Sequence, residues 1–218
     1  MNTKIDKKTM LIQRRILGIL CMALGPCSLI FGLLGMKTNF PNWYMSISDT
    51  YWCNSGMFNI GLLFATSIFF FSYSGYDKKD RIVSLIEAIS SMMLIVFPCD
   101  PHQAHITRVG LLNVNPTFSQ IIHSAFAAIL FIAYAYNITF LFTLSKGEKT
   151  EKKVLRNIVY YTAGVIIWIG IILQALFVLN LLRIPATVPF TMINEIVMLI
   201  AFGGAYLVKS EAVTVLND

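Results

Sequence analysis

Residues 157–182 read NIVYYTAGVIIWIGIILQALFVLNLL and lie between Arg156 and Arg183 without a charged side chain. A helix that crosses the hydrocarbon core of a bilayer needs about 20 predominantly apolar residues. The stretch exceeds this length, so it predicts a membrane-spanning helix.

The whole chain has the composition of an integral membrane protein. It contains 218 residues, of which 56% are hydrophobic and 13% are charged, and its mean hydropathy is +0.69. Soluble domains carry roughly 25% charged residues. The composition therefore argues against a soluble enzyme, a disordered chain and a small disulfide-linked scaffold.

The spacing of the remaining charges predicts six spans and an all-α membrane bundle. The predicted spans are residues 16–36, 53–73, 82–99, 118–145, 157–182 and 190–208. The first span follows a basic stretch, as in a signal sequence, but it is long and no small-residue cleavage site follows it, so we expect it to remain uncleaved. The longest connection covers only residues 100–117, which predicts one membrane domain over residues 1–218.

The basic residues predict the orientation of this bundle. With the N-terminus in the cytoplasm, 14 of the 17 lysines and arginines lie on the cytoplasmic side, and only Lys37, Arg108 and Arg183 lie outside. This asymmetry predicts that both termini are cytoplasmic, and we expect the protein in the plasma membrane. The net charge of +6 then indicates contact with anionic lipids of the inner leaflet and no nucleic-acid partner.

Three ionisable residues fall inside the predicted spans, namely Glu87, His123 and Glu195. Such groups cost roughly 2.5–3.5 kcal/mol at the centre of a membrane helix and therefore need partners. His123 and Glu195 lie at similar depth near the outer ends of their spans, so we expect them to hydrogen-bond directly or through one water. Glu87 lies near the inner end of its span, and we expect it to reach the basic stretch from Lys149 to Arg156 in a structural role.

Polar side chains in the outer half of the bundle predict a pocket that opens to the outside. Its expected ligand-binding residues are Asp49, Asn59, Asp100, His123, Gln174 and Glu195. In the alternative interpretation, the buried members of this set form hydrogen bonds that only hold the helices together. Cys53 and Cys99 fall at the outer ends of neighbouring helices, where a disulfide is geometrically possible but is not required.

Four residues of metal-ligand type support an alternative function. Asp100, His102, His105 and His123 could serve a metal-dependent membrane hydrolase of the ceramidase-like kind. The two loop histidines do not have helical i, i+4 spacing, and the last span lacks the second histidine pair of such enzymes. The sequence also contains no glycine-rich phosphate loop, Gly-x-Ser-x-Gly, Cys-x-x-Cys or His-Glu-x-x-His motif. We therefore predict no catalytic residue, no bound metal and no cofactor.

Short motifs between residues 46 and 142 resemble those of a family of uncharacterised six-span proteins. The motifs are SISDT at 46–50, FNIGL at 58–62, FPCDP at 97–101 and His123. This family is similar in plan to the FGF-receptor-activating protein and damage-regulated autophagy modulator group, which also places Ile-Ser-Asp-Thr before its second span. The chain departs from the pattern at His102 and His105. The resemblance implies a fold and a topology but no activity.

These observations together predict a non-enzymatic membrane protein. We expect it to bind, sense or move a lipid or small amphipathic molecule through the outward-facing pocket. Its expected partners are membrane lipids, and self-association is compatible with the sequence. The alternative non-enzymatic function is that of a structural or regulatory subunit of a membrane complex.

Overall fold

Six α-helices make up the part of the chain that the computed structural model describes, residues 7–34, 46–53, 55–73, 75, 77–103, 105–145 and 150–217. They are α1 (Lys7–Leu34), α2 (Gly56–Ser72), α3 (Lys78–Val96), α4 (Pro116–Tyr136), α5 (Glu151–Val178) and α6 (Phe190–Lys209). Three short helical segments accompany them: η1 (Ser48–Trp52), the π-helical η2 (Asn137–Leu141) and η3 (Thr214–Leu216). The six predicted helices are thus confirmed, although residues 35 and 36 of the first predicted span and Lys37 lie outside the described residues.

Polar side chains fix the starts of three helices. Asp77 caps α3 by accepting hydrogen bonds from the backbone N–H groups of Lys79 and Asp80, at 2.9 and 3.0 Å. Asn115 caps α4 in the same way, and the Thr150 hydroxyl caps α5. At its other end α3 stops at Val96 instead of the predicted Cys99, because the residue before Pro98 is disfavoured in a helix.

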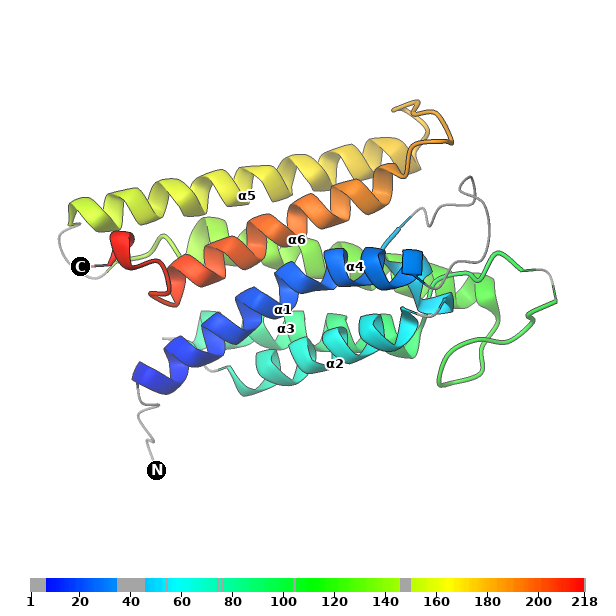
Figure 1. The fold of residues 1–218 in the computed structure, drawn as a ribbon, viewed down its shortest axis with the longest axis horizontal. Helices are drawn as coiled ribbons and strands as arrows, with labels where there is room; N and C mark the ends of the chain where they lie inside the picture. The colour runs from blue at the N-terminus through cyan, green and yellow to red at the C-terminus, as the bar shows by residue number, and fades with distance from the viewer. Residues whose placement is uncertain are drawn as a thin grey trace.

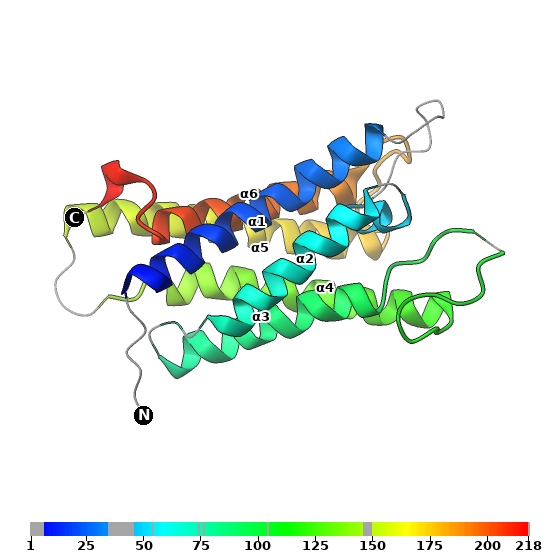
Figure 2. The same ribbon diagram turned by 60° about the horizontal axis from the view of Figure 1, so that its bottom comes forward.

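The helices form a closed ring in which each packs against its neighbours in the sequence, and α1 closes the ring against α6 (Figure 1). The start of α1 and the end of α6 lie at the same end of the bundle, which we call the terminal end. The opposite end, the loop end, carries residues 46–53 and the connection between α3 and α4 (Figure 2). The α1–α6 contact is the most extensive contact between any two helices.

Two glycines bring the backbones of α1 and α6 together. A Cβ atom at Gly203 would lie 2.5 Å from the carbonyl oxygen of Gly18, and one at Gly18 would lie 2.8 Å from the carbonyl oxygen of Gly203. Neighbouring Gly204 has no atom within 4 Å of the corresponding position. Small residues permit this close approach of membrane helices, and here only the first of the two adjacent glycines on α6 is required for it.

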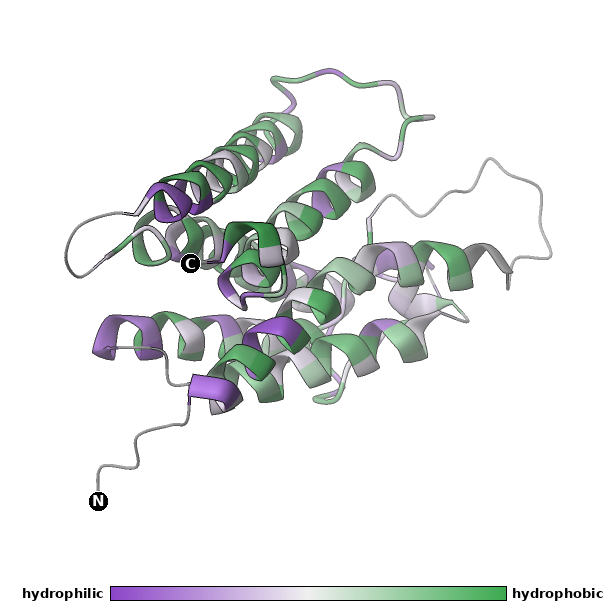
Figure 3. Ribbon diagram, turned by 60° about the vertical axis from the view of Figure 1, so that its left-hand side comes forward, coloured by the Kyte–Doolittle hydropathy of each residue, from purple (hydrophilic) through white to green (hydrophobic). Residues whose placement is uncertain are grey.

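The outer surface of the bundle is apolar, as expected for a membrane protein. Hydrophobic residues predominate along the helices in Figure 3. On α5, Ile158, Val165, Ile169 and Ile172 are each more than 50% exposed. Among the described residues, four helical stretches are long and apolar enough to cross a membrane: Lys7–Phe31, Pro116–Leu141, Glu151–Val178 and Phe190–Lys209. These stretches indicate an integral membrane protein.

We expect Gly203→Ala to destabilise the protein and Gly204→Ala to be tolerated. The added methyl group at residue 203 would meet the Gly18 carbonyl and the Met22 side chain, and overpacking of this kind costs about 1–3 kcal/mol. At residue 204 the methyl group enters open space, and alanine is favoured over glycine in a helix by up to about 1 kcal/mol. Thermal unfolding of the two purified variants in the same detergent measures the difference, and equal melting temperatures would contradict the assigned packing.

Candidate functional site

Residues 46–53, hereafter the 46–53 segment, fold into the loop end of the bundle. Ile47 is 5% exposed and Thr50 is completely buried. Ser46 and Asp49 shape the turn, because the Asp49 carboxylate accepts a hydrogen bond from the Ser46 N–H (2.8 Å) and the Ser46 hydroxyl accepts one from the Asp49 N–H (3.1 Å). The structure thus assigns the predicted ligand residue Asp49 a local role in forming this turn.

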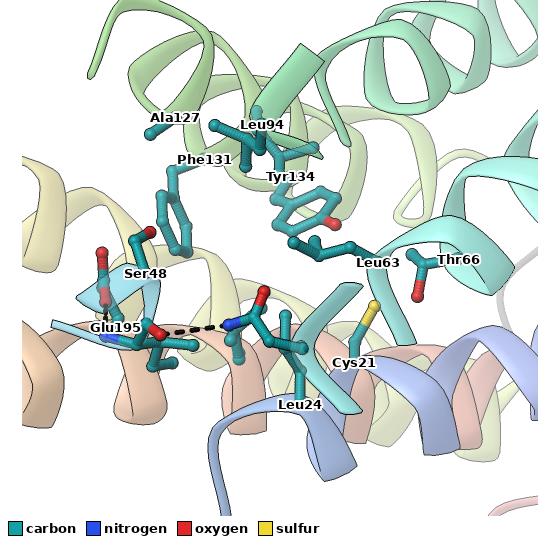
Figure 4. A pocket seen from close by; sticks show the side chains of 14 residues that line it. Cys21, Leu24, Ser48, Leu63, Thr66, Leu94, Ala127, Phe131, Tyr134 and Glu195 are labelled. Carbon is teal, nitrogen blue, oxygen red and sulfur yellow. Dashed lines mark hydrogen bonds between the residues drawn. The ribbon is translucent and has the colours of Figure 1, made fainter. Parts of the chain in front are cut away.

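Two helices bind the buried backbone of Ile47. The Glu195 carboxylate on α6 accepts a hydrogen bond from the Ile47 N–H at 2.8 Å (Figure 4). The Asn59 side-chain amide on α2 donates to the Ile47 carbonyl at 3.0 Å and to the Thr50 hydroxyl at 3.1 Å. A buried backbone needs partners for both its donors and its acceptors, and Glu195 and Asn59 supply them.

His123 on α4 connects the same segment to the end of α3. Its Nδ1 lies 2.8 Å from the carbonyl oxygen of Phe97, and its Nε2 lies 2.8 Å from the hydroxyl oxygen of Ser48. A carbonyl oxygen can only accept, so Nδ1 carries the proton, and in the neutral ring Nε2 accepts from the Ser48 hydroxyl. One turn earlier on the helix, the Ser119 hydroxyl donates to the Pro98 carbonyl at 2.6 Å.

A small cavity lies directly beneath the 46–53 segment (Figure 4). Its volume is about 40 Å³, which is enough for only a few water molecules. Its polar lining includes Ser48, Asn59, Thr66 and Glu195, and the remaining lining is mainly apolar: Leu24, Leu63, Leu94, Ala127, Leu130, Phe131 and Leu199. Ser48, Asn59 and Glu195 thus form a polar group beside the segment, and Thr66, Cys21 and Tyr134 add polar atoms farther along the otherwise apolar lining.

The predicted direct pairing of His123 and Glu195 is wrong. Both ring nitrogens of His123 have other partners, and Glu195 binds the backbone of Ile47. The two side chains lie at the same end of the bundle, as the sequence predicts. The adjacent residues Ile47 and Ser48 of the 46–53 segment connect them. The connection between the first two helices folds into the end of the bundle, so its residues Ile47 and Ser48 take the place of a direct contact between Glu195 and His123.

Asp100 and the loop histidines lie outside this cavity. The Asp100 carboxylate accepts from the His102 N–H at 2.7 Å, and the exposed His102 ring lies 3.9 Å from Asp100 and 4.0 Å from Asp49. His105 is exposed as well. Among the described residues, no three His, Cys, Asp or Glu side chains are grouped to hold a metal ion. The structure does not bring together the four residues of the alternative metal site.

Gln174 belongs to a separate contact between α5 and α6. Its side chain donates to the Thr191 hydroxyl at 3.0 Å and accepts from the Asn194 amide at 3.2 Å. The Asn194 amide also donates to the Gly170 carbonyl at 2.9 Å. Gln174 does not line the cavity, so its predicted place in the pocket is wrong. Its hydrogen bonds correspond to the alternative interpretation, in which polar groups hold helices together.

Glu87 is buried in the middle of α3, and its expected extension toward the basic loop is wrong. Its carboxylate accepts a hydrogen bond at 2.8 Å from the Asn137 amide of η2, which also donates to the Tyr206 hydroxyl at 3.2 Å. The helix begins at Lys78, earlier than predicted, so about 13 Å of helix separates Glu87 from that end. Lys149, the first residue of the expected partner stretch, lies outside the described residues.

Cys53 and Cys99 are both free thiols. The Cys99 thiol donates to the Ser48 carbonyl at 3.2 Å, whereas the Cys53 thiol donates to the Thr50 carbonyl at 3.0 Å. Burial raises the pKa of the Cys99 thiol to about 12, and the Asp49 carboxylate contributes in the same direction. At neutral pH this thiol is therefore protonated and poorly nucleophilic.

We expect Glu195→Ala to loosen the 46–53 segment and expose Cys99. The substitution leaves the buried Ile47 N–H without its acceptor, at a cost of about 1–3 kcal/mol, and each 1.4 kcal/mol raises the open fraction about tenfold. The rate of maleimide labelling of Cys99, measured by mass spectrometry, should therefore rise about tenfold for each 1.4 kcal/mol of lost stabilisation. The exposed Glu151→Ala serves as the control, and equal labelling rates in both variants would show that Glu195 does not hold the segment.

Comparison of the chain with known protein families, with characterised proteins and with solved structures found no match. The candidate site, the loop-end cavity beneath the 46–53 segment, is therefore defined by its own geometry. Glu195 and Asn59 line the cavity and bind Ile47, whereas His123 lies outside the lining and binds Ser48 of the same segment.

Proposed function

We propose that all six helices cross the plasma membrane, with the terminal end of the bundle in the cytoplasm. Two helices fall short of the other four in apolar length, since α2 has 17 residues and α3 carries five charged side chains. Both nevertheless expose apolar faces: Met57, Phe64 and Ile68 on α2, and Ile82, Ile86 and Ile89 on α3. Such faces favour contact with lipid.

We expect cysteine labelling to place residues 77–81 and 150–153 in the cytoplasm and residues 105–113 outside. Single cysteines are introduced at Lys79, Lys152 and Asn113, which are all exposed, in a variant whose four native cysteines are replaced. A membrane-impermeant maleimide added to intact cells should label only position 113. Labelling of position 79 or 152 before the cells are opened would reverse the proposed orientation.

We propose further that the protein binds, senses or moves a lipid or small amphipathic molecule, without catalysing a reaction. The observation that carries this proposal is the lining of the loop-end cavity, where polar groups from α2 and α6 meet an apolar interior. An amphipathic molecule matches such a lining, with its head group beside Glu195 and Asn59 and its chain among the leucines.

The 46–53 segment indicates the chemistry of the head group. Glu195 now binds a backbone N–H, and Asn59 binds the carbonyl of the same residue, Ile47. A ligand that replaces this backbone must offer a donor to Glu195 and an acceptor to Asn59. An amide head group satisfies both requirements.

The size of the cavity sets a condition for binding. A volume of about 40 Å³ holds water molecules but not a head group. The 46–53 segment must therefore move outward, which releases the groups that now bind it. Binding and displacement of the segment are then one process, and its free energy includes the lost Ile47 and Ser48 hydrogen bonds.

We expect a short-chain N-acylethanolamine to raise the melting temperature of the purified protein in a saturable way. The matching ester of ethylene glycol, which lacks the amide N–H, should have a much smaller effect, since a site built around a donor discriminates against its absence. Glu195→Ala and Asn59→Ala should abolish the difference between the two compounds.

Glu87→Gln is the matched control, because Glu87 is buried in the same bundle but lies outside the cavity lining. It should lower stability modestly and leave the response to the amide intact. Equal stabilisation by amide and ester in the unaltered protein would refute the proposed recognition. Loss of binding in a folded Glu87→Gln variant would instead favour a pathway through the membrane.

A further inference from the structure

Glu87 lies in the interior of the bundle with one of its carboxyl oxygens unpartnered. The side chain is completely buried, and its Oε1 accepts the hydrogen bond from the Asn137 amide at 2.8 Å. Among the described residues, no group donates a hydrogen bond to its Oε2, and Glu87 takes part in no ion pair. An ionised carboxylate here would be a buried charge with a single side-chain hydrogen bond, which is costly.

Protonation of Glu87 removes most of this cost. A group buried without a cationic partner adopts its neutral form instead of remaining charged. The carbonyl oxygen of the neutral acid still accepts from the Asn137 amide, while the proton resides on Oε2. The surroundings of Glu87 therefore suit a carboxylic acid better than a carboxylate.

The groups around Glu87 favour a proton over a metal ion. Hard metal ions such as Mg²⁺ and Ca²⁺ take about six or more oxygen ligands. The side-chain partner of Glu87 is instead an amide N–H, which is a donor, and the Ser91 hydroxyl is engaged in donating to the Glu87 backbone carbonyl at 2.8 Å. Among the described residues, no three side chains of metal-ligand type are grouped here or elsewhere. One free acceptor oxygen is sufficient for a proton.

Tyr134 connects Glu87 to the loop-end cavity. Tyr134 on α4 lines that cavity, is 1% exposed and interacts electrostatically with Glu87. It also interacts with the thiol of Cys21, another lining residue. Figure 4 shows Tyr134 and Cys21 on the side of the cavity away from Glu195. The polar groups of the cavity lining thus reach the neighbourhood of Glu87.

Polar side chains also extend from Glu87 toward the terminal end. The Asn137 amide that binds Glu87 donates as well to the Tyr206 hydroxyl at 3.2 Å. Tyr206 interacts electrostatically with Tyr73 and Arg14, and the Arg14 Nε donates to the Tyr73 hydroxyl at 3.0 Å. Tyr73 follows the last residue of α2, at the terminal end (Figure 2). Glu87 therefore lies between two groups of polar side chains that lead to opposite ends of the bundle.

The other ionisable groups that act on Glu87 come from several of the neighbouring elements. Asp80, in the first turn of α3, interacts with Glu87 and has a charge of the same sign. Tyr134 on α4, Tyr206 on α6 and Cys21 on α1 also interact with it, and tyrosine and cysteine are uncharged at neutral pH. Helix α2 and the segment η2 contain no charged side chain. None of these groups is a cation that would favour the ionised form of Glu87.

The π-helical segment η2 brings Asn137 to Glu87. It continues α4 directly after Tyr136, and Asn137 is its first residue. A π-helical turn is a rare irregularity that occurs frequently at functional sites. Its position beside a buried carboxyl group agrees with a binding site at Glu87.

We propose that Glu87 is a proton-binding site that takes up and releases one proton inside the bundle. The step is the formation or loss of one O–H bond at Oε2, with water as the other partner. Ionisable residues within membrane helices are typical of proton and ion pathways. Glu87 does not line the loop-end cavity, so this proposal is independent of the ligand proposed for that cavity.

Infrared spectroscopy of the full-length protein in a neutral detergent tests the protonation state. The carbonyl stretch of a carboxylic acid is separate from the bands of a carboxylate, so the spectrum of the unaltered protein minus that of Glu87→Gln reports on Glu87. We expect an acid band at about pH 7, where an unperturbed glutamate is ionised. The band should shift in heavy water, because a bound proton that is released exchanges with solvent.

Three further variants connect the band to the structure. Glu195→Gln removes a second carboxyl group inside the bundle and Glu151→Gln removes an exposed one, and neither should change the Glu87 band. Asn137→Leu removes the hydrogen bond that favours the ionised form. Because such a bond to a charged group is worth about 1.5–3 kcal/mol, Glu87 should bind its proton about tenfold more tightly or more. The acid band should then persist to higher pH.

Each outcome decides for or against the site. An exchangeable acid band that is lost in Glu87→Gln alone supports the proposal. Absence of the band at about pH 7, a band that does not exchange, or proton binding that is unchanged in a folded Asn137→Leu variant would overturn it. A band that appears only when sodium ions are replaced by choline would also overturn it, since Glu87 would then bind a metal ion. If Asn137→Leu does not fold, the band and its exchange in the unaltered protein still decide.

Discussion

The arrangement of the loop end depends on satisfying one buried peptide segment. A backbone buried among helices must find hydrogen-bond partners within the protein, and the backbone of the 46–53 segment finds them on α2 and α6. Glu195 and Asn59 bind the backbone of Ile47, and His123 binds Ser48. Helices α2, α4 and α6 are thereby connected through a loop as well as through their own packing. Ile47 and Ser48 of that loop form part of the lining of the cavity beneath it.

At the α1–α6 contact, backbone atoms of the two helices pack directly against each other. Gly18 and Gly203 let the two helices approach until a side chain on either would meet the opposite carbonyl oxygen. Further toward the loop end, a Cβ at Gly25 would meet the Ile196 side chain. Close packing of small residues replaces the hydrophobic effect as the force between helices in lipid. The helix that carries Glu195 is therefore held on a rigid support.

The six helices could be predicted because charge spacing reports directly on the length of an apolar stretch, as between Arg156 and Arg183. The partners of buried polar groups could not. The positions of His123 and Glu195 along their spans predict that they lie at the same depth. These positions do not indicate that a loop enters the bundle between the two side chains. Helix α3 begins at Lys78, before the predicted start of the span at residue 82. Glu87 therefore lies in the middle of the helix, although the sequence predicts it near the inner end. Pairing inside a bundle depends on helix rotation and loop insertion, which are properties of the packed structure.

Helix α6 contributes to three separate polar sites among the described residues. Glu195 lines the loop-end cavity, Tyr206 accepts a hydrogen bond from the Asn137 amide that also binds Glu87, and Lys209 lines a second cavity at the terminal end of the bundle. The first and last of these residues are separated by about 21 Å of helix. Because a helix moves nearly as a rigid body, a displacement of α6 along its axis would alter all three sets of contacts together. The backbone contact at Gly203 opposes such a displacement, since neighbouring atoms of α1 leave no free space there.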